Sequence, residues 1–534
     1  MSGRLLPAGG DATRAEHGAT RLRAMLEDSQ QKSRRRVVAI VGGGISGLAA
    51  AHRLQELSAA SAPDARESAT DFILLEASAR VGGTIRTERR EGFLLEGGPD
   101  AFISEKPEAR ALAERIGLAS HIIETNDEHR RSFVARGARL HPTPEGFQLL
   151  APSRLWPFVA SGIFSWTGKA RMALDLLLPR RRPASDAVND DDDESLAAFV
   201  RRRLGREALE RMAQPMVGGI YTADPEQLSL RATMPRFLEM ERRHRSLILA
   251  MWKAARQMSA TTGDGRAIQR STSGARYSLF LTFDGGMQML TDTLAARLPP
   301  ASLRLGTRVT SLAFRHESNG WLLTTETGET IHADAVCLAL PAYASAQLLR
   351  GLDASLADEL AAIPYASTAT VNLAFRRADI PHPLDGFGFV VPFIERRATI
   401  ACSFSSVKFA GRAPAGYALL RAFVGGALQP ETFALDEASI VAAVRRDLRE
   451  LLGVCEPPLY AHVAKWPRSM AQYHLGHLAR VERIRTRLAN HPTLRLCGNA
   501  YQGAGVPDCI RTGQQAAEQL KEVIGDKKEV ISDR

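Results

Sequence analysis

A glycine cluster near the start of the chain has the spacing expected of a phosphate-binding turn. Gly42, Gly44 and Gly47 follow the β-branched run at 37–41, and apolar residues then recur at helical spacing. The first glycine permits a tight turn, the second lets the backbone approach a pyrophosphate, and the third lets helix and strand pack closely. The N-terminus of the helix would offer free N–H groups to the phosphates. The pattern therefore predicts a dinucleotide site in a strand–turn–helix unit.

A carboxylate, Glu76, closes the second apolar run of the chain. At the end of a strand it can accept hydrogen bonds from ribose hydroxyls. In the segment EASARVGGTIRT, which begins at this residue, the acid is followed by Arg80 and by Gly82 and Gly83. This order resembles flavoproteins of the amine oxidase and phytoene desaturase superfamily. The resemblance indicates FAD rather than NAD as the dinucleotide.

Only one such fingerprint is present. The segment FDGGMQML, residues 283–290, lacks the glycine spacing, and we expect no buried strand before it. A flavoprotein without a second nucleotide site should not exchange hydride with NAD(P)H. We expect it to oxidise a bound substrate and to pass the electrons to molecular oxygen or another acceptor.

Length, charge and cysteine usage limit the class of protein. The 534 residues exceed one simple core and suggest two or three domains. The formal net charge of +10 and the pI near 9.6 favour anionic partners. No zinc-finger spacing, aromatic RNA-binding signature or continuous basic helix accompanies the charge, so we expect no nucleic acid partner. The five cysteines are far apart, which predicts reduced thiols in a cytoplasmic protein.

The order of helical and strand-like patterns predicts a discontinuous domain organisation. The expected fold class is α/β, or α+β over the whole chain, with a Rossmann-like FAD domain, an antiparallel-sheet substrate domain and a helical membrane-associated insertion. We divide the chain into a disordered N-terminal extension (1–35), an FAD-binding domain (36–105, 275–345 and 490–525), a helical membrane or substrate-access domain (106–215) and a substrate-binding domain (216–274 and 346–489). Charged segments at 58–71 and 180–194 are predicted surface loops.

Two distant segments narrow the class of flavoprotein. They are PMVGGIYTADPEQLSLRATMPRFLEME (215–241) and GNAYQGAGVPDCIRTGQQAA (498–517). Together with GGGISGLAAA, EGFLLEGGPDAF and FDGGMQML, they closely resemble the bacterial-type protoporphyrinogen oxidase family in order and spacing. The resemblance extends over residues 37–520. It implies an FAD domain, a substrate domain on an antiparallel sheet and a helical domain that rests on membranes.

The resemblance implies oxidation of protoporphyrinogen IX to protoporphyrin IX in haem biosynthesis. Six electrons and six hydrogens would leave in three flavin turnovers, with three O2 reduced to three H2O2. An alternative within the same family is coproporphyrinogen III, which carries four propionates instead of two. An amine oxidase or carotenoid desaturase is a more distant alternative that would not explain GGIYTADPEQLSLR. A non-catalytic flavin-binding protein or a regulator of tetrapyrrole supply is a third class.

Carried over to this sequence, the resemblance implies FAD contacts in six separate segments. They are Gly42, Gly43, Gly44, Ile45, Ser46, Gly47, Glu76, Ala77, Arg80, Gly83, Thr84, Gly97, Gly98, Pro99, Asp100, Val309, Trp466, Asn499, Ala504, Gly505 and Val506. The C-terminal helix would direct its N-terminus at the N1/O2 edge of the flavin, where reduced flavin gathers negative charge.

The resemblance also implies a substrate contact. Arg131, next to Arg130, matches the family's arginine that holds a substrate propionate, because a guanidinium binds a carboxylate bidentately. Asp100 departs from the animal enzymes, which carry a basic residue there, so the grip on the propionates must differ. We expect no catalytic acid or base and no metal, since hydride transfer to flavin N5 depends mainly on positioning. Packing or surface roles are expected for the histidines, including His141, His474 and His477.

The segment at 154–182, RLWPFVASGIFSWTGKARMALDLLLPRRR, mixes aromatic and basic residues. This mixture suits a helix lying in an anionic lipid interface, while a helix packed over the substrate pocket is the competing interpretation. We favour a peripheral contact with the cytoplasmic membrane. No run of 18 apolar residues without a charge occurs, so no spanning helix is predicted. A homodimer is compatible with the sequence.

Overall fold

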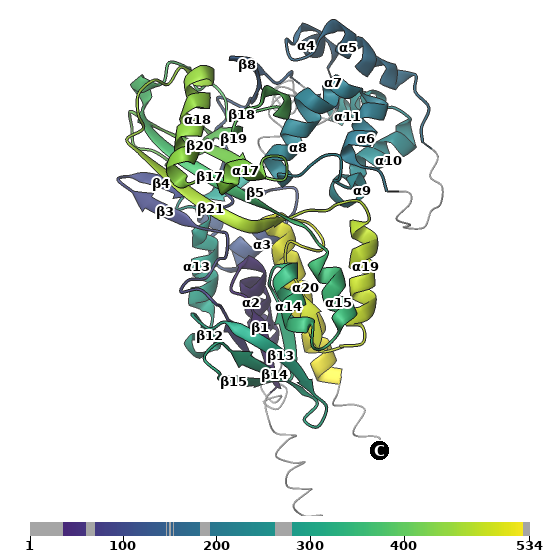
Figure 1. Cartoon of the computed structure of the whole chain (residues 1–534), viewed down its shortest axis with the longest axis vertical. Coiled ribbons are helices and arrows are strands. Elements are labelled where there is room, and N and C mark those ends of the chain that lie inside the picture. Colours follow the sequence, from purple (N-terminus) through teal and green to yellow (C-terminus); the bar gives the residue numbers. More distant parts are fainter. Residues whose placement is uncertain are drawn as a thin grey trace, which may run out of the picture.

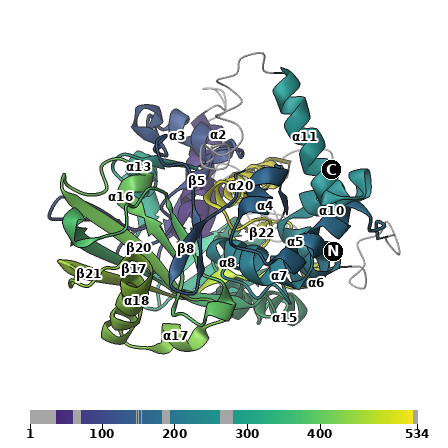
Figure 2. The same ribbon diagram turned by 90° about the horizontal axis from the view of Figure 1, so that it is seen from above.

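The computed structural model describes residues 36–59, 70–145, 147–148, 151–152, 154–181, 193–261 and 280–526. The predicted extension at 1–35 lies outside the described residues, as do most of the two predicted surface loops. Figure 1 shows three regions: a nucleotide region at the bottom, a large sheet at the upper left and a group of helices at the upper right. Figure 2, seen from above, separates the large sheet from the helices.

The nucleotide region is built on a five-stranded parallel sheet. Its strands, in spatial order, are β12 (Leu303–Arg304), β2 (Thr70–Leu75), β1 (Arg36–Val41), β16 (Ala335–Leu338) and β22 (Leu494–Leu496). The central strands are almost entirely apolar, as expected for a parallel sheet covered on both faces. Helices α2 (Ile45–Ala59) and α20 (Val506–Asp526) lie side by side against it, and a Cβ on Gly513 would clash with the backbone of Ser46.

Smaller elements complete this region. They are two three-stranded sheets, β13 (Val309–Arg315), β14 (Gly320–Thr325), β15 (Thr330–Ala333) and β5 (Phe102–Ile103), β11 (Phe280–Phe283), β6 (Ile122–Glu124), and the helices α3 (Glu108–Arg115), α13 (Gln288–Arg297), α14 (Ala342–Leu349), α15 (Ala354–Ala361) and α19 (His477–Leu488). The hairpin of β3 (Thr87–Arg90) and β4 (Phe93–Glu96) instead lies beside the large sheet, where Phe93 and Leu95 pack against Ala374 and Leu419. The expectation that no buried strand precedes FDGGMQML is wrong, because β11 ends at Phe283 and is largely buried. Strand β11 pairs antiparallel with β5 and β6, outside the parallel sheet.

The large sheet has seven strands. In spatial order they are β21 (Tyr460–Ala471), β17 (Tyr365–Arg376), β20 (Tyr417–Gly425), β19 (Thr399–Phe404), β18 (Gly388–Val390), β7 (Phe133–Arg136) and β8 (Arg139–Pro142). All neighbours are antiparallel except β18 and β7. Alternate residues of β17 and β20 are apolar and form a core with α18 (Glu437–Leu452), which Asp436 caps and Gly453 ends. The other face of β17 carries Thr370 and Asn372.

The helical region lies beside this sheet. It contains α4 (Leu155–Ala160), α5 (Trp166–Ala173), η3 (Leu174–Leu176), α6 (Leu196–Arg203), α7 (Arg206–Ala208), the π-helical η5 (Leu209–Ala213), α8 (Gln214–Tyr221), α9 (Leu230–Thr233), α10 (Pro235–His244) and α11 (Leu247–Thr261). The elements in this region differ from those expected from the predicted domain boundary at residue 215. Strands β7 and β8, from the segment predicted as helical, belong to the large sheet, whereas α9 to α11 join the helices. Hydrogen bonding across distant strands decides this assignment.

The aromatic segment at 154–181 forms two short helices rather than one long helix. Ser165 caps α5 by accepting a hydrogen bond from the N–H of Gly168. Phe158 and Phe164 are buried, whereas Trp156 and Trp166 are 79% and 73% exposed. Half of the aromatic residues therefore pack into the helical core, and half face solvent.

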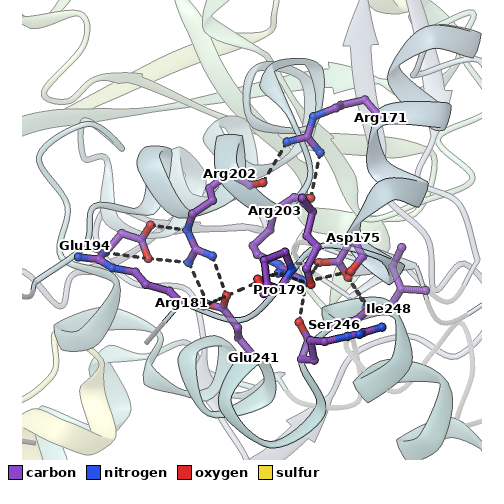
Figure 3. Close-up of polar contacts among 12 residues, drawn as sticks. Arg171, Asp175, Pro179, Arg181, Glu194, Arg202, Arg203, Glu241, Ser246 and Ile248 are labelled. Atoms are coloured by element: carbon purple, nitrogen blue, oxygen red, sulfur yellow. Dashed lines mark hydrogen bonds and ion pairs between the residues drawn. The ribbon is translucent and has the colours of Figure 1, made fainter. Parts of the chain in front are cut away.

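A buried ion pair ties this segment to the rest of the helical region (Figure 3). Asp175 and Arg203 are both fully buried, and the Nε of Arg203 donates to Oδ1 of Asp175 at 2.6 Å. The other oxygen of Asp175 accepts from the hydroxyl of Ser246 and from the N–H of Ile248 at the start of α11. Arg203 also donates to the carbonyl of Pro179. One carboxylate thus joins η3, α6 and α11.

Asp175→Ala is expected to lower the free energy of unfolding by about 3–5 kcal/mol, because it leaves the buried guanidinium of Arg203 unpaired. Urea unfolding followed by circular dichroism measures the effect. Glu210→Ala is the matched control, since its partner Arg206 is exposed, and unfolding should change little. Equal effects of the two substitutions would contradict the role assigned to the buried pair.

Candidate active site

The three motif glycines lie where strand β1 turns into helix α2, and two of them have no room for a side chain. Gly42 has a φ of +110°, and a Cβ there would clash with the carbonyl of Ala339. A Cβ on Gly47 would clash with the carbonyl of Gly42. The turn is therefore closed by direct backbone contact between the first glycine and the helix.

The middle glycine differs from the other two. A Cβ on Gly44 would meet no protein atom within 4 Å. Gly44 bridges to Gly82, so the glycine pair of the second motif lies beside the first motif, and a Cβ on Gly83 would lie 3.4 Å from the Cα of Gly44. Ile45 and Ser46 follow as the first residues of α2. The open space at the start of a helix fits a phosphate group.

Glu76 lies against the same turn. Its Oε2 accepts from the N–H of Gly43 at 2.6 Å, and its Oε1 accepts from the N–H and the hydroxyl of Ser78. The backbone of Glu76 pairs with Thr307, which brings Val309 at the start of β13 into the same neighbourhood. The carboxylate keeps further lone pairs for ribose hydroxyls. Ala77 follows and is exposed.

Arg80 lies within the loop of the second glycine motif and binds its backbone. Its guanidinium donates to the carbonyls of Val81, Gly83 and Ile85, and burial lowers its pKa. These bonds fix the shape of the loop that carries Thr84. The arginine therefore stabilises the conformation of the loop that contains Gly82 and Gly83.

The GGPD segment lies between this loop and the large sheet. A Cβ on Gly98 would clash with the carbonyl of Thr84, and the N–H of Gly97 donates to the carbonyl of Arg86 at 2.8 Å. On the opposite side, the indole N–H of Trp466 donates to the carbonyl of Gly97 at 2.7 Å. Residues predicted from two distant motifs are thus in direct contact.

Asp100, which follows Pro99 in this segment, is held by two cations. The Nζ of Lys408 lies 2.9 Å from its Oδ2, and Nη1 of Arg421 lies 3.6 Å from its Oδ1. Burial alone would raise the pKa of Asp100, but the two cations outweigh it and lower the pKa to about 2. We call Asp100, Lys408 and Arg421 the Asp100 cluster. No local pattern in the sequence predicts either cation as a partner of Asp100, because both lie more than 300 positions away in the chain.

The C-terminal motif reaches the site through helix α20. The side chain of Asn499 donates to the carbonyl of Ser469, three residues after Trp466. Ala504 and Gly505 immediately precede the first helical residue, Val506. In the first turn, Asp508 is buried and its carboxylate binds Lys106 at 2.6 Å. The predicted residues therefore stand at a helix N-terminus, beside an ion pair that sequence analysis also missed.

The predicted substrate arginine is engaged with a neighbouring acid. Arg131 forms an ion pair with the carboxylate of Asp385, and its Nε donates to the carbonyl of that residue at 2.6 Å. Its side chain is 48% exposed. The adjacent Arg130 is paired with Asp127. Of the two, Arg131 is the more accessible to a solute carboxylate.

The three histidines singled out in the sequence are His141, His474 and His477. His477 is buried and stacks on Tyr473 with ring centroids 4.0 Å apart, and burial lowers its pKa to about 4. Burial also lowers the pKa of His141 and of His474. Within the described residues, no group of three or more His, Cys, Asp or Glu side chains could hold a metal ion.

Comparison with known proteins identifies the family. The model of the flavin-containing amine oxidoreductases matches residues 45–521. A coproporphyrinogen III oxidase of Bacillus subtilis (strain 168) is 36% identical, covering 90% of this chain and 96% of its own. A chloroplastic protoporphyrinogen oxidase of Oryza sativa subsp. japonica is 30% identical, covering 91% and 88%. A crystal structure from Exiguobacterium sp. 255-15, also named for protoporphyrinogen oxidase, has a TM-score of 0.77 and 29% identity, covering 91% and 99%.

The chain belongs to the flavin-containing amine oxidoreductase family. It is an FAD-dependent oxidoreductase, and its place is among the porphyrinogen oxidases. The predictions of the family, of FAD and of enzymatic activity are therefore confirmed. The chain also has the mixed α/β fold of these flavoproteins, with several sheets.

The open space at Gly44 makes a specific prediction for flavoprotein assembly. Gly44→Ala adds a methyl group that meets no protein atom, so the apoprotein should keep its unfolding temperature. Because that methyl occupies the space expected for the pyrophosphate, FAD affinity should fall at least about tenfold, or about 1.4 kcal/mol. Titration of apoprotein with FAD, followed by flavin fluorescence, measures the change.

Two substitutions calibrate this result. Gly351→Ala also adds a methyl group in open space, but outside the motifs, and should leave FAD affinity unchanged. Gly47→Ala forces a clash with the carbonyl of Gly42 and should lower the unfolding temperature of the apoprotein. Unchanged FAD affinity in Gly44→Ala would show that the pyrophosphate lies elsewhere.

Proposed function

We propose that this protein oxidises coproporphyrinogen III to coproporphyrin III, with molecular oxygen as the electron acceptor. The sequence motifs pointed first to protoporphyrinogen IX, with coproporphyrinogen III as the alternative. The observation that carries the proposal is the 36% identity, over 90% of the chain, to a coproporphyrinogen III oxidase, against 30% to a protoporphyrinogen oxidase. This difference supports the alternative substrate over the first one.

The reaction removes six electrons and six hydrogens from the porphyrinogen ring system. Bound FAD would accept two electrons from the substrate in each of three turnovers and deliver them to O2, giving three H2O2. The protein's part is to bind the macrocycle, to orient a bridging carbon and to exclude water, because a fixed geometry supplies much of the rate enhancement. No acid or base side chain is assigned to the reaction.

The residues proposed to hold FAD divide into two groups. The turn at 42–47 and Glu76 would bind the pyrophosphate and the ribose, since they offer helix N–H groups and a carboxylate at one place. Residues 97–100, Trp466 and the start of α20 would lie along the flavin. Their mutual contacts support a single binding site.

The proposed substrate contact is Arg131. Its exposed guanidinium already binds the carboxylate of Asp385, so its geometry suits a carboxylate partner. A propionate of the porphyrinogen would compete with Asp385 for these donors. Coproporphyrinogen III offers four such groups, and the net positive charge of the chain favours a more anionic substrate.

Anaerobic mixing of the holoenzyme with each porphyrinogen tests the substrate. Loss of the flavin absorbance should be at least about tenfold faster with coproporphyrinogen III than with protoporphyrinogen IX. Subsequent aeration should release three H2O2 for each porphyrin formed, measured by porphyrin fluorescence and a peroxidase assay.

Other results of the anaerobic mixing experiment would support one of the alternative functions. Faster bleaching with protoporphyrinogen IX would restore the first substrate. Bleaching by amines or carotenoid precursors alone would place the chain with other flavin oxidases. Bound flavin that no porphyrinogen reduces would indicate a non-catalytic flavin-binding protein or regulator.

We also propose that the segment at 154–181 contacts a membrane surface as a peripheral protein would, on the cytoplasmic side. Its exposed apolar side chains support this proposal. They are Trp156, Val159, Trp166, Leu174 and Leu177. Within the described residues, no helix has the length and apolar character needed to cross a membrane. A surface contact of this kind buries aromatic side chains at the level of the lipid headgroups.

Charge supports an anionic lipid as the partner. The segment contains five basic residues and one acid, Asp175. That acid is buried against Arg203, so its charge is compensated within the protein. Lys169 lies 4.4 Å from the ring of Trp166, but it is buried and donates to the carbonyl of Val159, so the cations available to lipid are the more exposed arginines of the segment. Aromatic anchors with nearby cations favour anionic membranes.

Co-sedimentation with vesicles containing anionic lipid tests this surface. The double substitution Trp156→Ala and Trp166→Ala should reduce the bound fraction at least about fivefold, since two apolar anchors are lost. Leu459→Ala, at an exposed apolar residue outside the segment, should bind like the unaltered protein. Phe158 is left unaltered, because it is buried and does not face a lipid surface. Equal binding of all proteins would refute the role of the segment.

A further inference from the structure

Three consecutive carbonyls, at the end of β4 and the start of the GGPD segment, are bound by side chains of the large sheet. The carbonyl of Glu96 accepts from the amide of Asn372, and that of Gly97 accepts from Thr370 at 2.8 Å as well as from Trp466. The carbonyl of Gly98 accepts from Nη2 of Arg421. We call residues 96–98 the Gly97 segment. Its carbonyls are all directed at one sheet.

The register of the sheet explains why these donors converge. Asn372 on β17 is the direct cross-strand partner of Arg421 on β20, and Thr370 lies two positions before Asn372 on the same face. Trp466 on β21 pairs with Thr368, which again shares that face. Since side chains of a strand alternate between faces, every donor projects from the same side. The apolar residues between them face the α18 core.

The Asp100 cluster adds a buried charge to this arrangement. Arg421 is 2% exposed and lies 4.6 Å from the ring of Phe423. The cluster contains two cations, Lys408 and Arg421, and one anion, Asp100. Nearby, Arg412 and Glu96 add one guanidinium and one carboxyl, both buried. The surroundings of the Gly97 segment therefore carry more positive than negative groups, away from water.

We propose that Arg421 and Lys408 are positioning residues for the flavin reaction. They fix the Gly97 segment and Asp100 against the flavin, and their surplus positive charge favours the reduced flavin. The inference rests on the proposed function, which places residues 97–100 along the flavin. Reduced flavin gathers negative charge, and a fixed charge in a water-excluded site acts on it strongly, at no cost of reorganisation.

A purely structural role would have a different signature. Removing a buried hydrogen-bonded group destabilises the fold whatever its charge. An electrostatic effect on the flavin instead changes sign with the charge removed. Substitution of a cation and of the anion in the same cluster therefore separates the two explanations.

The experiment measures the two-electron midpoint potential and the visible spectrum of the bound flavin in purified holoprotein. Lys408→Met and Arg421→Met should shift the equilibrium toward oxidised flavin by about tenfold, which is about 30 mV more negative. Asp100→Asn should shift the midpoint in the positive direction, because it removes the only anion of the cluster. The flavin absorption bands should move in all three variants.

Arg203→Met is the matched control. Arg203 is as buried as Arg421 and also binds backbone carbonyls, but its partners belong to the helical region (Figure 3). This variant should lose stability and keep the midpoint potential and spectrum of the unaltered protein. A shift equal to that of Arg421→Met would overturn the proposal.

The remaining outcomes are also decisive. If Arg421→Met does not fold, the opposite shifts of Lys408→Met and Asp100→Asn carry the test. Shifts of the same sign in those two variants, or none in folded holoprotein, would overturn the inference. The potential is measured without porphyrinogen, so failure here is distinct from failure of the proposed function, in which the unaltered protein oxidises neither porphyrinogen.

Discussion

Gly97 links the large sheet to the loop of the second glycine motif. Two side chains of the large sheet, Thr370 and Trp466, donate to its carbonyl, while the N–H of the same residue donates to the loop of the second glycine motif. A buried carbonyl without partners would cost free energy, so these bonds fix how the sheet stands relative to the nucleotide region. Every residue proposed to lie along the flavin depends on this relation.

Buried charges serve two different purposes in this protein. In the helical region, Asp175 and Arg203 form a buried pair, and Arg203 also lies 3.6 Å from the carboxylate of Glu241, which pairs with Arg202. Backbone groups and Ser246 use the remaining donors and acceptors of the Asp175–Arg203 pair. Such a pair contributes specificity of packing more than stability. Around Asp100 the charges do not balance, because two cations face one carboxylate. A surplus of buried positive charge costs free energy. Such a surplus is expected at a functional site, where a negatively charged ligand or intermediate compensates it.

Local features of the site could be predicted from the sequence, since each depends on residues near one another in the chain. The requirement for glycine at Gly47 follows from a backbone contact within a single turn, with the carbonyl of Gly42. At Gly42 the positive φ is local, whereas the carbonyl that a Cβ would meet belongs to the distant Ala339. Strand β17 can also be recognised in the sequence, because apolar and polar residues alternate along it. Nothing in that pattern indicates which segment the polar face with Thr370 and Asn372 binds.

Other features depend on contacts that no local pattern encodes. Strands β7 and β8 join the large sheet through a parallel pairing with β18, more than 250 positions away in the chain. The partners of Asp100 come from β20 and from the segment before it. Within one aromatic segment, composition could not separate the buried Phe158 from the exposed Trp156. These outcomes are decided by tertiary packing, which overrides the local signal.

The choice of substrate is a difficulty of the same kind. Proteins named for two different porphyrinogens match this chain over about nine-tenths of its length. The glycine turns and the Gly97 segment are proposed to hold the flavin, so they would not distinguish the ring substituents of the two substrates. The two substrates differ in the number of propionates at the edge of the macrocycle. Discrimination is therefore expected of exposed cations, of which Arg131, paired here with Asp385, is the proposed example. Such residues contribute little to the fold, so the motifs that identify the cofactor carry no information about them.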